Sequence, residues 1–362
     1  MTTDRNLSRR HKLVQAIRKV GVPALLVTNP KNVSYLTGFT GEDSYLLIGP
    51  DVLHIFSDSR FETQLQGESP AIPAAIRTSR TTMTEFLGRE LTKFKLSSLG
   101  IEASSMTVDV RDTLVEKLSP LELVPQVALV EELRQIKDAD EIDELRLAVR
   151  QAERGYAVMK SLLIPEMTER QAAHELEHGM RRFGALKAAF EPIIAVGDRS
   201  ALPHYRAGLR RFEESPFVLC DWGAVSPQGY HSDLTRVWAT GKVSPKLLRI
   251  YGVVLKAQQA AIAAIGPGVK CQDVDGVARK VIDQAGYGKN FGHGLGHGIG
   301  LDIHEGPRFS PISRDELKPG MVVTVEPGIY LPGLGGVRIE DDVLVTRDGC
   351  EVLTSVSREL EA

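Results

Sequence analysis

Two carboxylates flank a turn signal in the middle of the chain. A strand-like apolar run ends in Asp221, a Ser-Pro-Gln-Gly turn signal follows at 226–229, and strand character resumes over 230–237. A hairpin symmetric about Pro227 places Asp221 opposite Asp233, with both side chains on the same face. Two like charges in that position repel each other, so the pair requires a compensating partner.

A second carboxylate pair has the same construction further along the chain. An apolar run ends in Glu326, a turn rich in glycine and proline follows, and the returning strand carries Glu340, at the same distance from Gly333. Burying either pair without compensation costs several kcal/mol, and a shared divalent cation removes that cost. Taken singly, either hairpin is equally consistent with solvated strand ends that pair with Arg236 and Arg338. The two hairpins together favour a metal site.

Three of the nine histidines, His293, His297 and His304, lie within twelve residues of a glycine-rich stretch. Glycine permits the close backbone approach that a crowded metal loop requires. One imidazole added to four carboxylates gives a mainly oxygen ligand set without thiolates. Such a set suits Mn²⁺, Co²⁺, Fe²⁺ or Zn²⁺.

A competing metal motif lies at 174–178, where His-Glu-Leu-Glu-His matches the helical His-Glu-x-x-His pattern of zinc proteases. The residues around such ligands are normally uncharged, whereas Glu177 lies between these two histidines and two arginines follow them. A solvated helix face explains the stretch better. We therefore expect that replacing His174 and His178 together by alanine costs little activity.

The composition is that of an ordinary globular protein. The 362 residues are enough for two domains, and 42% are hydrophobic and 25% charged. The net charge of -3, without long charged blocks, argues against a nucleic-acid or anionic membrane partner. Three scattered cysteines form no disulfide or zinc pattern, and no apolar run reaches the roughly 18 residues of a membrane span. We expect a cytoplasmic protein.

Two patterns of secondary structure follow one another along the chain. Up to about residue 130 the pattern is α/β, with helix-like stretches between short apolar runs at 24–28, 45–48, 52–56 and 99–102. Beyond that point, four long helices are predicted from capping residues and periodicity. Their expected starts are Asp138 or Asp140, the capping box at 168–171, Ser244-Pro245, and Val274.

Five ordered motifs in the second part of the chain resemble those of a known family. They are Pro203-His204-Tyr205, 229–236, 293–304, 325–328 and 338–341. The sequence resembles the pita-bread metallopeptidases, in the proline-directed branch that includes aminopeptidase P and prolidase. In the first part, 32–39 and 57–61 resemble the creatinase-type N-terminal domain, and 132–137 resembles the segment that leads into the catalytic domain. The implied fold is α+β, with an α/β creatinase-type domain over 1–130 and a pita-bread catalytic domain over 131–362.

The resemblance implies two divalent ions, with manganese as the first candidate and cobalt, iron or zinc as alternatives. By position, Asp221 chelates one ion, Asp233 and Glu340 bridge both, and His297 and Glu326 complete the other. These are the same carboxylates that the two hairpins bring forward.

The resemblance also implies the residues that handle the substrate. Glu326 is expected to transfer protons, and His204, His293 and His304 are expected to line the substrate site and assist catalysis. Arg338 is expected to contact the substrate. His204 and His304 belong near the bond that is cleaved, and His293 nearer the proline pocket.

The implied function is that of a dinuclear Xaa-Pro aminopeptidase, which releases the residue preceding proline by metal-hydroxide hydrolysis. One alternative is an Xaa-Pro dipeptidase that cleaves only dipeptides, and another is a non-catalytic, peptide-binding member of the fold. The partners expected are proline-containing peptides and a second copy of the chain in a homodimer, with no nucleic acid and no membrane.

Two features depart from the family pattern. Asp221 and Asp233 are twelve residues apart where the family commonly has eleven, and Val237 stands where a threonine usually follows Thr-Arg. We expect the extra residue to lengthen the turn at Pro227 and to leave metal binding intact.

Overall fold

The computed structural model describes residues 4–360 and divides into two compact units, the first ending at Leu133 and the second beginning at Arg134. Each unit contains its own cluster of buried apolar side chains. None of the helices within residues 4–360 combines the length and apolar character of a membrane-spanning segment.

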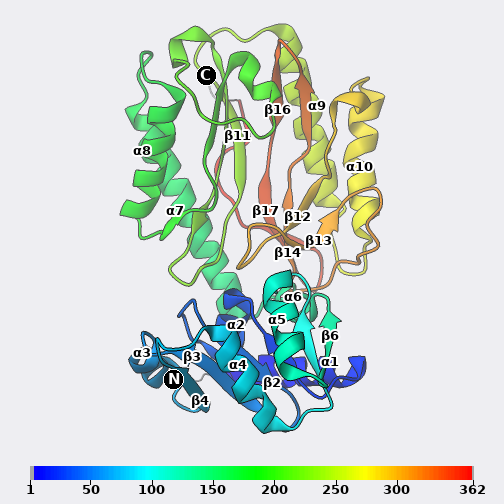
Figure 1. Ribbon diagram of the computed structural model, residues 1–362. Helices are drawn as coiled ribbons and strands as arrows, with labels where there is room; N and C mark the ends of the chain where they lie inside the picture. The colour runs from blue at the N-terminus through cyan, green and yellow to red at the C-terminus, as the bar shows by residue number, and fades with distance from the viewer. Residues whose placement is uncertain (1–3, 361–362) are drawn as a thin grey trace. The chain divides into compact units, whose positions relative to one another are not determined.

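The first unit is a mixed α/β structure (Figure 1). Its strands are β1 (Leu25–Val27), β2 (Tyr45–Ile48), β3 (Leu53–Asp58), β4 (Ala74–Arg77), β5 (Ser98–Glu102) and β6 (Glu122–Gln126). Its helices are α1 (Asp4–Val20), α2 (Pro30–Thr37), α3 (Glu62–Glu68), α4 (Met83–Leu91), η1 (Thr92–Phe94), α5 (Val108–Leu118) and α6 (Leu129–Arg134). The sheet has the order β4-β3-β2-β1-β5-β6, with the β1–β2 and β2–β3 pairs antiparallel and the others parallel. The α/β pattern expected for this part is confirmed.

The helices of the second unit begin where capping residues predict. They are α7 (Ala139–Leu162), α8 (Glu169–Arg182), η2 (Gly197–Ala201), η3 (Phe212–Glu214), α9 (Pro245–Ala263), α10 (Cys271–Gln284) and η4 (Gly288–Asn290). Asp138 and Thr168 form capping boxes at the starts of α7 and α8, and Ser244 caps α9. Only α10 starts earlier than predicted, at Cys271.

The strands of the second unit lie between two helix pairs, α7–α8 and α9–α10 (Figure 1). These strands are β7 (Lys187–Ala188), β8 (Ile193–Val196), β9 (Phe217–Trp222), β10 (Ala224–Val225), β11 (Leu234–Ala239), β12 (Gly296–Gly298), β13 (Glu305–Phe309), β14 (Val322–Val325), β15 (Gly328–Leu331), β16 (Gly335–Arg338), β17 (Asp341–Val345) and β18 (Cys350–Val352). The two larger sheets have the orders β11-β9-β8 and β13-β12-β14-β17-β18. The α+β class is confirmed.

The first hairpin has a different register from the predicted one. Asp221 pairs with Thr235 rather than with Asp233. The loop contains Pro227, Gln228 and Gly229, and Gly229 adopts a φ of +87° and donates its N–H to the Ser226 carbonyl. This is the form of a type I turn followed by a left-handed residue, so the hairpin is centred one residue beyond the proline. Asp233 therefore lies diagonally across from Asp221.

The second hairpin has the predicted register. Val325 pairs with Asp341 and Gly328 with Arg338, so Glu326 and Glu340 lie at matching positions between these pairs. The turn contains Pro332 followed by Gly333, which has a φ of +76°. Proline and then a glycine with positive φ are the two central residues of a type II turn.

Candidate active site

One cavity of the second unit, about 830 Å³ in volume, collects all the residues predicted to take part in the chemistry. Its lining includes Asp221, Asp233, His297, Glu326, Glu340, His204, His293, His304 and Arg338. They come from β9, β12 and β16, from the positions next to β11, β14 and β17, and from the segment after η2 and the loops before β12 and β13. The roles implied for them stay predictions, but their placement around one cavity is a property of the structure.

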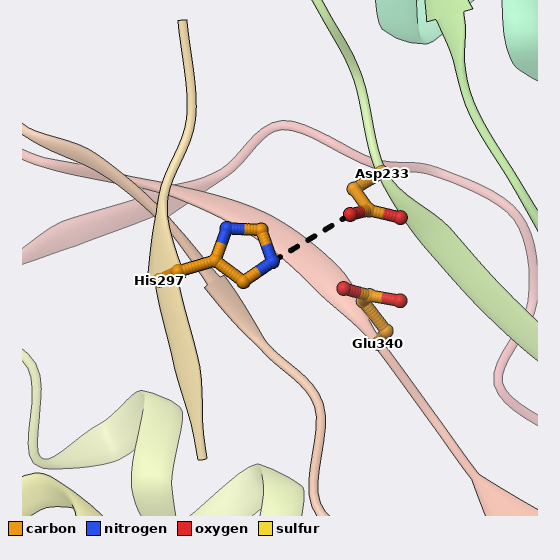
Figure 2. Close-up of side chains that lie close together, drawn as sticks. All are labelled: Asp233, His297 and Glu340. Atoms are coloured by element: carbon orange, nitrogen blue, oxygen red, sulfur yellow. Dashed lines mark ion pairs between the residues drawn. The ribbon is translucent and has the colours of Figure 1, made fainter. Parts of the chain in front are cut away.

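Three of the five predicted ligands converge on one point (Figure 2). Asp233, His297 and Glu340 each offer a ligand atom, and these atoms lie within 4.8 Å of one another. His297 Nε2 is 3.7 Å from Asp233 Oδ2. All three residues are buried, so the cluster could hold a metal ion away from solvent.

Glu326 and Asp221 extend the cluster on two sides. Glu326 Oε1 lies 3.5 Å from His297 Nε2, and its side chain is 18% exposed. Asp221 Oδ2 accepts a hydrogen bond from the Arg338 guanidinium. Its buried Oδ1 has no hydrogen-bond partner within residues 4–360. Because buried polar atoms are normally paired, this oxygen fits a cation as its missing partner.

The carboxylates of the cluster strongly disfavour their charged forms. Burial, followed by the charges of neighbouring carboxylates, raises the pKa of Asp233 and of Glu340 well above the ordinary range. Burial is also the largest cause that raises the pKa of Glu326, to about 8. A divalent cation would reverse these shifts, because it stabilises exactly those ionised forms that burial penalises.

The imidazole of His297 is held in the tautomer that a metal ligand needs. Burial lowers its pKa to about 3, with His304 as a second cause, so the ring is neutral. Its Nδ1 donates to the Gly298 carbonyl at 3.1 Å, which leaves the Nε2 lone pair directed at the carboxylates. A Cβ on Gly296 would lie 2.1 Å from the Thr324 carbonyl oxygen, so glycine is required where the strands meet. The expected use of glycine around this histidine is confirmed.

Two threonines contact carboxylates that are predicted to be ligands. Thr235 Oγ1 donates to Glu340 Oε2 at 2.7 Å and accepts from Arg338 Nε at 3.1 Å. Thr324 Oγ1 lies 3.4 Å from Glu326 Oε1 and accepts the His297 N–H at 3.1 Å. Such hydrogen bonds orient the oxygens of ligating carboxylates.

Tyr330 is a site residue that the sequence reasoning missed. Its hydroxyl accepts from Arg338 Nη1 and donates to His293 Nε2, each at 2.9 Å. His293 can accept because its Nδ1 donates to the Gly294 carbonyl and because burial lowers its pKa to about 4. The hydrogen-bond chain Asp221–Arg338–Tyr330–His293 thus links the acidic cluster to the wall of the cavity at His293. Tyr330 lies four residues after Glu326 in the same hairpin. Because side chains on a strand alternate between faces, that spacing was the signal that could have identified it.

Arg308 is a second missed residue. It is exposed on β13, lines the cavity near His304, and its guanidinium has no hydrogen bond or ion pair to any residue from 4 to 360. An arginine in that state can receive an anionic group of a ligand. Within the sequence alone, nothing distinguishes it from other surface arginines.

The arginines considered as ion-pair partners of the hairpins divide between two roles. Arg338 does contact Asp221, as the structural alternative requires. Arg236 instead pairs with the buried Asp341, at 2.7 Å, and reaches only the backbone carbonyl of Glu340. The alternative in which Arg236 neutralises a site carboxylate is therefore not what the structure has.

The His-Glu-x-x-His stretch lies on an exposed face of α8. Both His174 and His178 are exposed, and Glu177 pairs with Arg181 at 2.9 Å. Leu176 belongs to the opposite, buried face. This is the solvated helix face that the charges predict.

Family models and solved structures match this chain along nearly its whole length. The model of metallopeptidase family M24 matches residues 143–347, and that of the creatinase/prolidase N-terminal domain matches 9–136. The chain is 36% identical to an Xaa-Pro dipeptidase of Pyrococcus furiosus, over 97% of this chain and 99% of that one.

Two solved structures show the same similarity in three dimensions. An Xaa-Pro dipeptidase from Bacillus anthracis has a TM-score of 0.93 and 37% identity, with 98% of this chain and 99% of that chain covered. An X-Pro aminopeptidase from Thermotoga maritima has a TM-score of 0.88 and 33% identity, with 96% and 100% covered. With a buried acidic cluster around one imidazole inside the matched region, these similarities lead to one conclusion: the chain belongs to metallopeptidase family M24 and carries a creatinase/prolidase-type N-terminal domain.

Proposed function

We propose that the protein is a two-metal exopeptidase that hydrolyses the bond between an N-terminal residue and proline, with Xaa-Pro dipeptides as its substrates. The observation that carries the proposal is the convergence of Asp233, His297 and Glu340 beside Glu326 and Asp221 in one cavity. Its substrate class is supported by relatives named for Xaa-Pro hydrolysis at 33–37% identity.

Five residues would hold the two ions: Asp221, Asp233, His297, Glu326 and Glu340. Manganese is our first candidate, since the ligands are oxygens with a single nitrogen. A divalent pair supplies Lewis acidity and lowers the pKa of a water molecule towards neutrality. The orphaned Asp221 Oδ1 and the raised pKa values of the carboxylates are the features of this chain that support such a pair.

The protein's own residues would move protons and orient the substrate. Glu326 would take a proton from the attacking water and pass it to the proline nitrogen as that nitrogen leaves. His304 lies with its ring centroid 4.4 Å from that of His297, where it can hydrogen bond to the carbonyl oxygen of the cleaved bond. His204 lines the same cavity, and His293 and Arg338 are joined through Tyr330. His204 would offer a hydrogen-bonding group to the peptide, and His293 and Arg338 would line the wall against which it binds.

Arg308 favours dipeptides over longer peptides. In a dipeptide the proline carries a free carboxylate close to the cleaved bond, and an arginine without an acidic partner can bind it in two hydrogen bonds. The aminopeptidase expected first from the sequence is the second candidate. It is favoured by the volume of about 830 Å³, which is within the range that accommodates ligands larger than a dipeptide.

A substrate panel tests the proposal. We expect the manganese-loaded protein to hydrolyse Xaa-Pro faster than Xaa-Pro-Xaa, and the metal-free protein to be inactive. Cobalt and zinc arms identify the preferred ion. Faster hydrolysis of Xaa-Pro-Xaa identifies the aminopeptidase, and binding of proline peptides without hydrolysis identifies a non-catalytic member of the fold.

The role of Arg308 on β13 has a matched control in the loop that follows this strand. Arg308→Ala should raise the KM for Xaa-Pro by about 10-fold or more, because one charged hydrogen-bonding partner of the substrate is lost. Arg314→Ala removes an exposed arginine six residues away that does not line the cavity, and should leave the KM unchanged. Equal KM values for the two variants would exclude Arg308 as the carboxylate-binding group.

A further inference from the structure

His304 depends on its backbone for its orientation. It ends the connection 299–304 between β12 and β13, and its imidazole makes no hydrogen bond to any residue described between 4 and 360. Its ring stands edge-on to the His297 ring, at a centroid distance of 4.4 Å and an interplanar angle of 78°. Whatever holds the connection therefore decides the point from which this imidazole enters the cavity, and the His297 ring is its one aromatic contact among the described residues.

Two buried basic side chains, Arg134 and Lys137, hold the connection on both sides of His304. Arg134 Nη2 donates to Asp302 Oδ2 at 2.6 Å and also to Glu305 Oε1. Lys137 Nζ donates to Glu305 Oε2 at 3.2 Å. Asp302 and Glu305 are the residues two before and one after His304, so the anchor spans the histidine.

The anchor formed by Arg134, Lys137, Asp302 and Glu305 is largely buried and closely packed. The side chains of Arg134, Lys137 and Glu305 are 2%, 1% and 6% exposed. The Asp302 N–H donates to Glu305 Oε1 at 3.0 Å, and a Cβ on Gly300 would lie 2.7 Å from that carboxylate. These contacts fix the backbone of the connection on both sides of His304.

The energetics of such an anchor indicate positioning rather than stabilisation. Replacing a buried ion pair by apolar residues is often neutral for stability, so a buried pair is weak evidence of a stabilising role. A group that aligns a reacting side chain acts on the catalytic rate instead, because a displacement of 1 Å can lower the rate by about 10²-fold.

We infer that Arg134 and Lys137 are positioning residues that hold His304 against the metal cluster by way of Asp302 and Glu305. They belong to the Glu-Leu-Arg-Gln-Ile-Lys segment at 132–137. The inference rests on the proposed function only for the statement that His304 assists hydrolysis. The function of this segment would then be to orient an imidazole that lies 170 positions after Arg134 in the sequence.

A double-mutant cycle tests the inference on manganese-loaded enzyme. Arg134→Met and His304→Ala should each lower kcat for Xaa-Pro, by up to about 10²-fold for the arginine. In the His304→Ala background, Arg134→Met should cause no further loss, because the histidine through which it acts is gone. Losses that multiply would overturn the inference. Arg146→Met, which removes an exposed ion pair with Glu351, is the control and should leave kcat unchanged.

A second variant covers the case in which Arg134→Met does not fold. Arg134→Lys keeps the buried charge but not the planar guanidinium, so we expect it to fold and to lose about 10-fold in kcat. Asp302→Ala cuts one of the two anchors at a residue that is 37% exposed, and should give a loss of similar size. Wild-type kcat in both variants would overturn the inference.

Nuclear magnetic resonance separates this inference from the proposed function. In zinc-loaded protein with labelled histidine, the His304 signal is identified by its absence from His304→Ala. Arg134→Lys should shift or broaden that signal and leave the His293 signal unchanged, whether or not any Xaa-Pro peptide is hydrolysed. An unchanged His304 signal would overturn the positioning role, whereas a substrate panel without turnover would count only against the proposed function.

Discussion

The two hairpins that carry the carboxylates have similar turns but different relations between their acids. In the β9–β11 hairpin, Asp221 is opposite Thr235 and diagonal to Asp233. In the hairpin of β14–β17 and β15–β16, Glu326 and Glu340 occupy matching positions. The first hairpin therefore contributes two staggered acids and the Thr235 hydroxyl, whereas the second contributes two acids at matching positions on its two strands.

Proline is the first of three loop residues in both turns, so the centre of each hairpin is the residue after it. The centre predicted for the second hairpin, Gly333, is the residue after the proline and is correct. The centre predicted for the first hairpin, Pro227, is the proline itself and is one residue too early. The positive φ falls on the third loop residue, Gly229, in one turn and on the second, Gly333, in the other. Hairpin register thus depends on turn geometry that a symmetric pattern of acids does not reveal.

The largest expected effect is on activity and compares Glu326 of the second hairpin with Asp221 of the first. Glu326 is proposed to transfer a proton, and Asp221 to bind metal only. Glu326→Gln should fold normally and lower kcat by about 10²–10⁴-fold with little change in KM, because the group that moves the proton is lost. Asp221→Asn should instead lose activity that added manganese partly restores. Steady-state kinetics across a metal titration measures both, and Glu351→Gln is the control. Recovery of Glu326→Gln by added metal would contradict the proton-transfer role.

The second prediction concerns the hydroxyl between the hairpins. Thr235→Val keeps the shape of the side chain but removes the hydrogen bonds to Glu340 and Arg338, and should cost about 10–100-fold in metal affinity or activity. Thr240→Val, which removes an exposed hydroxyl at the far end of β11, should have no effect. Metal binding by isothermal calorimetry with a parallel activity assay decides between them. Equal behaviour of the two variants would mean that the corrected register has no functional consequence.

The third prediction follows from the burial of Glu326 on the second hairpin, with the charge of Asp221 on the first hairpin as a smaller cause. Glu326 has a pKa of about 8 in the cation-free protein, against an ordinary value of 4.5, so the folded state binds this proton more tightly than the unfolded chain. The resulting stability is full below about pH 4.5 and is lost as the pH rises through about 8. His297, with its pKa lowered to about 3, opposes this trend only below its ordinary value of 6.5.

Metal-free protein should therefore melt at a lower temperature at about pH 9 than at about pH 7. Saturating manganese should raise the melting temperature most at the higher pH, because its ligands are then already deprotonated. Scanning calorimetry with and without a chelator measures this. Metal-free Glu326→Gln should show a smaller pH dependence, and an identical one would show that Glu326 is not the titrating group.

The smallest expected effect compares the two turns directly. Gly229→Ala and Gly333→Ala each place a Cβ at a positive φ and should lower the free energy of unfolding by about 1–2 kcal/mol. A Cβ on Gly333 meets no atom within 4 Å and one on Gly229 meets only Leu301 at 3.7 Å, so the cost is backbone strain in both. Urea unfolding of the metal-loaded proteins should give similar values. A much larger loss for Gly229 would show that the first turn also controls its hairpin's register.

Local patterns in the sequence were sufficient for much of the fold and for the composition of the candidate site. The caps Asp138, Thr168 and Ser244 predict where helices begin, since capping requires only a side chain and the next turn of backbone. The four acids were identified from residue types and spacing, because burying several carboxylates without a cation is costly. Spacing narrowed the imidazole to three histidines, and only the family resemblance pointed to His297 among them.

The tertiary structure decided which groups meet. Several contacts of the site join segments that are distant in the sequence or on separate strands. They are the contact of Arg338 with Asp221, the hydrogen bonds of Thr235 and Tyr330, and the anchoring of His304 by Arg134. Periodicity and turn signals describe one segment at a time, whereas these contacts depend on how whole sheets pack. Packing is determined by the burial of many side chains at once, and that sum is not visible in any single motif.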